Sequence, residues 1–443
     1  MTTESTMTVP DRIDRLLREL GIKHAHFAGR SLGDLSGLAA QKPGLFASLT
    51  LVCPWGLDVD IVSPLAPQLL VFRGESEGYD TIGKQVMSMP DAALAVARND
   101  IPWSDLIARH RDDIVPRLLP FLAEKTSAAG LTAAALHDGE VGSAAGINYR
   151  VQGSGPPLVL MPLGLVPSQW DPILELLAEN YCTITLGGPH LGAIAVLEER
   201  AATAGWRDMM TALVQTVPLA ADSTVLEIGC GTGANMRWLA QRTVVQNQIV
   251  GVDLNRYFLR EATDMARRDG LDDIVQFKEG DALALPFNND QFDLTLSITV
   301  LEEIHADLAL AEMIRVTKPG GYVGVIVRAK DVPFFVNLPI DVSIKAKLEH
   351  PSAHGSDAGP DGCADATLYS RFHASPLTAV KIFPFLAAFN EPAVLDIFRA
   401  WMGELLDDRE RAVFYAACER VKADGTFVWS YPHHCAIGVK PTA

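Results

Sequence analysis

Short, uninterrupted apolar runs alternate with amphipathic segments along the whole chain of 443 residues. Strands of a parallel sheet are buried on both faces and read as apolar runs, whereas the helices that cover them show one apolar stripe. The alternation therefore predicts the α/β fold class, and no internal repeat is found. In the first 124 residues, strands are predicted at 24–29, 47–53, 68–73 and 92–97, and helices at 9–20, 32–41 and 104–124.

Residues 125–146 are small, rich in glycine and poorly periodic, so we predict an irregular connection there. A second strand-rich stretch follows, with strands predicted at 157–161 and 181–186 and an amphipathic helix near Ser168 to Glu179. A chain of this length exceeds what one core supports, so we expect two domains.

The strongest chemical signal is "STVLEIGCGTGANMRWLA", residues 223–240. It predicts a buried strand, an acidic residue, a glycine-rich turn and a helix. Gly229, Gly231 and Gly233 let the backbone turn tightly and approach a ligand, which the free N–H groups of the helix start can bind. The same letters satisfy the dinucleotide fingerprint G-x-G-x-x-G/A, so at this point a nicotinamide enzyme remains an alternative.

The segments that follow predict further strands in succession, two of them ending in an acidic residue. Asp253 ends the next predicted strand, where its carboxylate can accept both hydroxyls of a ribose, which also fits either cofactor. Asp281 ends a third strand, a fourth runs from Phe292 to Ser297, and a helix and a Pro-Gly-Gly turn lead into a fifth.

This series resembles the class I S-adenosylmethionine-dependent methyltransferases, especially those of quinone and small-molecule methylation, and the ordered matches favour this family over a dehydrogenase. The resemblance covers about residues 205–330 and implies a seven-stranded Rossmann-like domain, with a helical insertion at about 385–422 and a seventh strand, antiparallel at the sheet edge, in "GTFVWSYPHHCAIGVKP". It implies that the first acidic residue and the glycines hold the methionine part of S-adenosyl-L-methionine, that Asp253 binds ribose and that "GDA" borders adenine. The cofactor-binding residues expected on this basis are Glu227, Gly229, Gly231, Gly233, Asp253, Leu254, Asp281, Ala282 and Ser297.

Methyl transfer asks little of side chains, because the sulfonium methyl is already activated and the protein mainly aligns the acceptor. If a base is used, His305 in the loop after the fourth strand is the first catalytic candidate, and His433 or His434 the second, since histidine titrates near neutrality. For each, a packing or surface role is the alternative. No metal is expected at "HHC", because adjacent strand residues point to opposite faces.

The N-terminal stretch "HFAGRSLGDLSGLAA", residues 26–40, resembles the nucleophile turn of the α/β-hydrolases. Gly29, Ser31 and Gly33 match the G-x-S-x-G pattern, and Glu77 stands where that family places its acid. The family's histidine is missing, because "NDIPWSD" with Asn99 and Asp100 stands in its place. A serine without its base is weakly nucleophilic.

The strands that precede such a turn resemble residues 147–195, so 10–124 and 147–195 would form one hydrolase-like domain with its halves in swapped order and no cap. The oxyanion loop departs from the pattern at Pro162 to Gly164. The expected domains are 1–200, hydrolase-like, and 201–443, the methyltransferase. The first is expected to be a catalytically silent scaffold, substrate cover or oligomer surface. A bifunctional esterase, with His190 or His110 reaching Ser31, is the alternative.

The composition of the chain excludes some classes of binding partner. A net charge of −17 argues against binding nucleic acid. The absence of a signal pattern or a long apolar run predicts a cytoplasmic protein without a membrane span. The six cysteines form no CxxC pair, so neither disulfides nor zinc are expected. The expected function is methyl transfer to a small, apolar or aromatic acceptor. A non-enzymatic cofactor-binding assembly protein is the other alternative, and a homodimer is left open.

Overall fold

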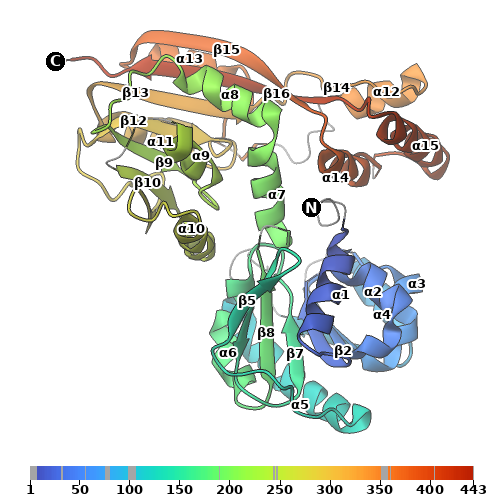
Figure 1. Cartoon of the computed structure of the whole chain (residues 1–443). Helices are drawn as coiled ribbons and strands as arrows, with labels where there is room; N and C mark the ends of the chain where they lie inside the picture. Colours follow the sequence, from blue (N-terminus) through green and yellow to red (C-terminus); the bar gives the residue numbers. More distant parts are fainter. Residues whose placement is uncertain are drawn as a thin grey trace. The chain divides into compact units, whose positions relative to one another are not determined.

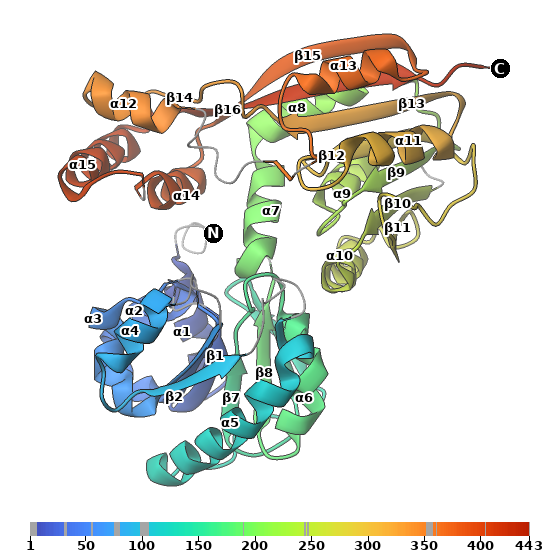
Figure 2. The same cartoon turned by 180° about the vertical axis from the view of Figure 1, so that it is seen from behind.

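The chain forms two compact units, Met1–Val196 and Leu197–Ala443, in the computed structural model (Figures 1 and 2). The expected boundary at residue 200 falls inside helix α7, Gly192–Ala202, which begins in the first unit and ends in the second. The residues that the structure describes are 7–30, 33–54, 56–74, 80–97, 106–188, 190–242, 245, 248–350, 358–359, 361–403 and 405–442.

The N-terminal unit is built on an eight-stranded sheet of order β4-β3-β2-β1-β7-β8-β6-β5. Six strands, from β4 to β8, are parallel, and β6 and β5 continue the sheet antiparallel. The strands are β1 Ala25–Gly29, β2 Phe46–Val52, β3 Leu69–Gly74, β4 Ala93–Ala97, β5 Val141–Ala144, β6 Ile147–Gln152, β7 Pro157–Leu160 and β8 Cys182–Gly187. The helices are α1 Val9–Glu19, α2 Ser36–Gln41, α3 Val59–Val62, α4 Asp80–Met87, α5 Leu106–Ala129 and α6 Asp171–Ala178.

Alternation along buried strands divides the apolar residues of this sheet between two cores. Phe27 packs in one core and its neighbour Ala28 in the other. The prediction of an irregular connection at 125–146 is wrong at both ends. Helix α5 continues to Ala129, and β5 forms from Val141 because its backbone pairs antiparallel with β6 despite its small side chains.

The C-terminal unit holds a second sheet of order β11-β10-β9-β12-β13-β16-β14, with β15 paired to β16. Its strands are β9 Thr224–Ile228, β10 Gln248–Asp253, β11 Val275–Glu279, β12 Phe292–Ile298, β13 Thr317–Arg328, β14 Phe335–Val336, β15 Thr378–Phe389 and β16 Trp429–Val439. The helices are α8 Ala204–Val214, α9 Ala234–Arg242, α10 Arg256–Arg268, α11 Ala306–Val316, α12 Val342–Glu349, α13 Thr367–Ala374, α14 Pro392–Gly403 and α15 Asp408–Asp424.

Strands β11 to β13 are parallel, and β16 runs antiparallel to both of its long neighbours. The predicted antiparallel seventh strand is therefore present, but it lies between β13 and β15 instead of at the edge. The expected insertion at 385–422 begins later, because β15 extends to Phe389, and it consists of α14 and α15. Their apolar residues Phe398 and Phe414 join the same core as Ile249 of the sheet.

No helix in the described ranges combines the length and the apolar composition that crossing a bilayer requires.

Candidate cofactor and acceptor site

A tight glycine loop joins β9 to α9. Gly229, Gly231 and Gly233 all have left-handed backbones, with φ of +66°, +52° and +70°. A Cβ at Gly229 would lie 2.3 Å from a methyl of Val300, and one at Gly233 would lie 2.5 Å from the ring of Phe277. At Gly229 and Gly233 a side chain is therefore excluded both by backbone strain and by contact.

Asp253, the last residue of β10, fixes this loop. One carboxylate oxygen accepts the N–H of Gly231 at 2.8 Å, and the other accepts the N–H of Asn255 at 2.8 Å. Burial raises the pKa of Asp253, although these backbone hydrogen bonds act in the opposite direction. The carboxylate predicted to bind ribose thus also holds the neighbouring loop.

Glu227, the predicted acidic residue of β9, is buried with 3% of its surface exposed. Its Oε1 accepts the side-chain N–H of Asn235 at 2.8 Å, and Asn235 Oδ1 accepts the indole N–H of Trp206 at 2.9 Å. Burial raises the pKa of Glu227 to about 7, against the opposing effects of Asn235 and Arg200. This carboxyl is poised to hold a cation or to keep its proton.

The other predicted cofactor residues follow neighbouring parallel strands. Leu254 is 71% exposed, and the carboxylate of Asp281 accepts the N–H of Leu283 at 2.8 Å. Ala282 is half-buried beside it. Ser297 is fully buried near the end of β12, and its Oγ has no hydrogen-bond partner among the described residues. All of them lie at or beside the carboxyl edge of the sheet, where open α/β folds bind ligands.

The two catalytic candidates reach the same edge from different elements. His305 precedes α11 at its N-cap, half-buried, and its Nδ1 finds no partner in the described part of the chain. His433 is 2% exposed on β16 and its ring packs edge-on against Trp206. Its neighbour His434 faces different surroundings, with its two ring nitrogens 2.7 Å from the Tyr369 hydroxyl and from Asp331.

A buried ionic cluster that the sequence reasoning missed lies beside His433. Glu302 is fully buried, and its Oε1 accepts the backbone N–H of Arg328 at 2.7 Å and its Nε–H at 3.3 Å. Its Oε2 has no partner among the described residues. Burial raises the pKa of Glu302 and raises that of Tyr431 to about 12. The pairing of β13 with β16 sets Arg328 opposite His433, which brings these groups together.

Residues 226–325 match the family model described as "Methyltransferase domain". The methyltransferase GfsG of Streptomyces halstedii is 36% identical over 121 residues, which cover 27% of this chain and 42% of that protein. A demethylmenaquinone methyltransferase of Lactobacillus johnsonii is 30% identical over 139 residues, covering 31% of this chain and 56% of that protein. The solved structure of the YcgJ protein from Bacillus subtilis covers 54% of this chain and all of its own, with 18% identity and a TM-score of 0.36.

Residues 226–325 of the C-terminal unit are thus similar to methyltransferase domains. This chain spans about half the length of the curated relatives that it matches. The cofactor expected for this unit from its sequence is S-adenosylmethionine. The residues present fit a polar ligand of this kind, because two glycines of the loop leave no room for a side chain and because Ser297 Oγ and Glu302 Oε2 are buried without partners in the described ranges.

The sequence predicts the glycine loop and Asp253 as cofactor residues and His305 as a base in the loop after β12, but it does not single out Glu302. That loop contains both His305 and Glu302, and only the structure shows that Glu302 is the fully buried one. Its carboxylate stood in the sequence beside the chosen histidine, so a search for acids after the fourth strand could have found it.

The hydrolase-like candidates of the N-terminal unit lie mostly outside the described residues, namely Ser31, Glu77, Asn99 and Asp100. Of the two histidines considered as bases, His190 is half-buried against Gly146, and burial together with Arg12 lowers its pKa. His110 is 5% exposed at a kink in α5.

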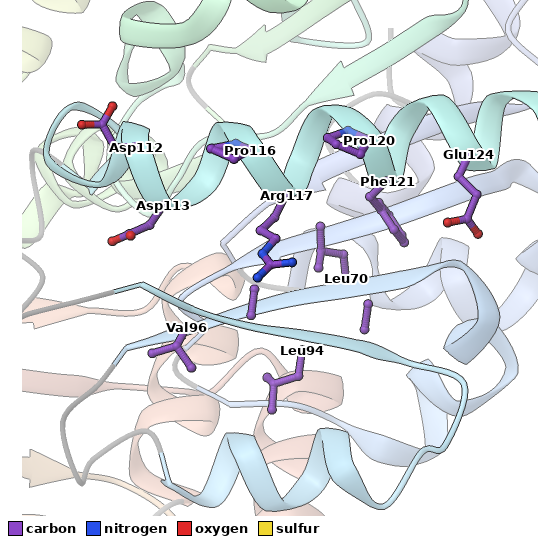
Figure 3. Close-up of a pocket in the computed structure, with 12 residues that line it drawn as sticks. Leu70, Leu94, Val96, Asp112, Asp113, Pro116, Arg117, Pro120, Phe121 and Glu124 are labelled. Atoms are coloured by element: carbon purple, nitrogen blue, oxygen red, sulfur yellow. The ribbon is translucent and has the colours of Figure 1, made fainter.

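A groove of about 960 Å³ in the N-terminal unit lies between α5 and strands β3 and β4 (Figure 3). Its rim carries Asp112, Asp113 and Glu124 from α5, and Arg117 points into it. None of the predicted site residues lines this groove.

Proposed function

We propose that the chain transfers the methyl group of S-adenosylmethionine to a small, apolar or aromatic acceptor. The observation that carries this is the glycine loop of left-handed residues, closed by the carboxylate of Asp253 at the carboxyl edge of the C-terminal sheet. When bound there, the cofactor supplies an activated methyl group, so the chain's own residues bind, orient and exclude water.

In this proposal the two ends of the cofactor are held by different strands. Glu227 and the loop of Gly229, Gly231 and Gly233 hold the methionine part after β9. Asp253 accepts the ribose hydroxyls after β10, with Leu254 beside it. Asp281 and Ala282 border adenine after β11, and Ser297 closes the site from β12. The convergence of four strand ends on one edge supports this assignment.

A buried aromatic cluster beside Glu302 supports an apolar acceptor. Tyr431, beside Glu302, packs against Phe334 and Trp429 at ring distances of 4.9 and 5.6 Å. These rings belong to the same core as Phe398 of the insertion. We propose that the insertion covers the acceptor and that the cluster at its base handles the acceptor's proton.

Three groups are candidates for the proton acceptor. His305 and His433 remain the histidine candidates, with a free Nδ1 on His305 as far as the described residues show. Glu302 joins them, because its Oε2 is buried without a partner in the described ranges and burial raises its pKa, and both features suit a carboxylate that accepts a proton.

We further propose that the N-terminal unit is an α/β-hydrolase-like domain with swapped halves that performs no chemistry. Pairing of β1 with β7, in which His26 lies opposite Leu158, joins the two halves in one sheet and supports this topology. The unit then serves as scaffold, cover or oligomer surface, and the full chain is expected in the cytoplasm.

The test is incubation of the full chain with methyl-labelled S-adenosylmethionine and an extract of its host, followed by mass spectrometry of labelled small molecules. The proposal expects at least one labelled product that is missing with Gly229→Val. Cofactor binding without any labelled product would overturn methyl transfer and favour a cofactor-binding assembly protein.

A further inference from the structure

The loop after β12 brings the carboxyl group of Glu302 to the glycine loop. Val300, two residues before Glu302, packs directly against Gly229. Arg200 interacts electrostatically with both Glu302 and Glu227, so these two buried carboxyl groups lie around one cation. Glu302 is therefore beside the site proposed for the cofactor, where an acceptor has to lie.

A segment outside the residues 226–325 that match the family model holds the backbone of Glu302. The Glu302 carbonyl oxygen accepts the N–H of Gly359 at 2.8 Å, and the carbonyl oxygen of the preceding residue accepts the N–H of Cys363 at 2.8 Å. A Cβ at Gly362 would collide with the carbonyl oxygen of Glu302, so the segment lies directly on it. The side chain of Glu302 therefore starts from a backbone that is fixed by its neighbours.

The two carboxylate oxygens of Glu302 differ in their partners. Oε1 accepts the backbone N–H of Arg328 at 2.7 Å and its Nε–H at 3.3 Å. Oε2 is buried and has no hydrogen-bond partner among the described residues. A buried carboxylate oxygen without a donor is unfavourable, and an acceptor that brings an O–H or N–H group to Oε2 removes this cost.

The charges around Glu302 distinguish between these two donors. Both Arg328 and Arg200 interact electrostatically with Glu302. Two cations disfavour an alkyl amine, which is itself a cation at neutral pH, and favour a neutral hydroxyl, whose oxygen gains negative charge as its proton leaves. The ring of Tyr431, which interacts with Arg328 and packs 4.9 Å from the ring of Phe334, offers apolar surface to the rest of the acceptor.

We propose that the acceptor is a hydroxyl compound that is methylated on oxygen, with Glu302 Oε2 receiving the hydroxyl proton. The inference rests on the proposed function and deepens it by naming the substrate class. The hydroxyl oxygen forms a bond to the methyl carbon, and the bond between that carbon and the sulfur of the cofactor breaks with its electron pair left on sulfur. The hydroxyl proton passes to Oε2. The products are a methyl ether and S-adenosylhomocysteine, and no further reactant is needed.

The first test uses the unchanged full chain. It is incubated with methyl-labelled S-adenosylmethionine and an extract of its host, and NMR of the purified product identifies the atom to which the labelled methyl is bonded. The inference expects a methyl ether. A labelled methyl bonded to carbon, nitrogen or sulfur would overturn the inference while leaving methyl transfer intact. No labelled product at all would overturn the proposed function and this inference with it.

The second test removes the proton acceptor. Glu302→Gln keeps the shape of the side chain but cannot receive the proton, so we expect formation of the labelled ether to slow by about a hundred- to ten-thousandfold, with the affinity for S-adenosylhomocysteine retained. Glu303→Gln is the matched control, because Glu303 belongs to the same loop but its side chain is 59% exposed. It should form the ether at the wild-type rate. Equal rates for both variants would overturn the inference.

Thermal melting verifies that Glu302→Gln is folded. If that variant unfolds, Gly362→Ala replaces it, because the added methyl group contacts the carbonyl oxygen of Glu302 and displaces the residue. Gly44→Ala is its control, since no heavy atom lies within 4 Å of the Cβ position at Gly44. Slower ether formation with Gly362→Ala alone would support the inference, and wild-type rates for both variants would overturn it.

Discussion

In each unit a helix follows a buried parallel strand, α9 after β9 and α2 after β1, but the polar groups beside these two strands have different partners. After β9, the loop is tied to Asp253 while neighbouring groups such as Ser297 Oγ lack partners in the described ranges. Beside β1, His26 is fully buried with its ring nitrogens 2.7 and 2.8 Å from Ser48 and Thr126. A buried polar group satisfied by its own chain stabilises a fold, whereas one without a partner in the described ranges, such as Ser297 Oγ or, in the N-terminal sheet, Thr50 Oγ1, can bond to a ligand or to water.

The largest loss of cofactor affinity is expected from a substitution of Gly229. Gly229→Val forces a branched side chain against Val300 at a left-handed position, so we expect cofactor affinity to fall by more than about a hundredfold. Gly270→Ala is the control, since Gly270 has φ of +68° but no heavy atom within 4 Å of its Cβ position. Calorimetry with S-adenosylhomocysteine measures the affinity of both variants. Equal losses of affinity would show that backbone strain, and not the contact with Val300, causes the effect.

Asp253 gives the next effect. Asp253→Ala removes the acceptor of two backbone N–H groups and of the proposed ribose hydroxyls, and should weaken cofactor binding by about 1–3 kcal/mol. Asp264→Ala, which removes an exposed carboxylate paired with Arg267 on α10, should leave the affinity unchanged. Similar affinities for both variants would contradict the assigned role of Asp253.

Glu227 offers a test through pH. Because its pKa in the folded chain is about 7 and its ordinary value is 4.5, the folded state binds the extra proton between these values. Its contribution to stability is therefore present at low pH and is lost as pH rises through about 7. From pH 5 to pH 8, the free energy of unfolding of the wild type, measured with denaturant, should fall by about 1–3 kcal/mol more than that of Glu227→Gln. Parallel pH profiles for the two proteins would show that Glu227 is not buried in this way.

The smallest effect concerns the N-terminal unit. Ser31→Ala should change neither the labelled methyl product nor the melting temperature, because the proposal gives this serine no chemistry. A serine-directed phosphonate should fail to label the wild type. Labelling that disappears in Ser31→Ala would instead support the bifunctional esterase.

The sequence predicts those parts of the methyltransferase domain that consecutive strands and their motifs form. Gly229 to Gly233 and Asp253 belong to consecutive strand ends, so motif spacing places them together. Arg328 and His433 are 105 positions apart and meet only because β16 pairs antiparallel with β13. Strand β5 was missed for a similar reason, since pairing with β6 outweighs its small side chains.

The most direct measurement of the central claim is calorimetric titration of the full chain with S-adenosylhomocysteine. The account predicts one binding site per chain, lost in Gly229→Val and retained in Gly270→Ala. No binding by the wild-type chain would contradict it.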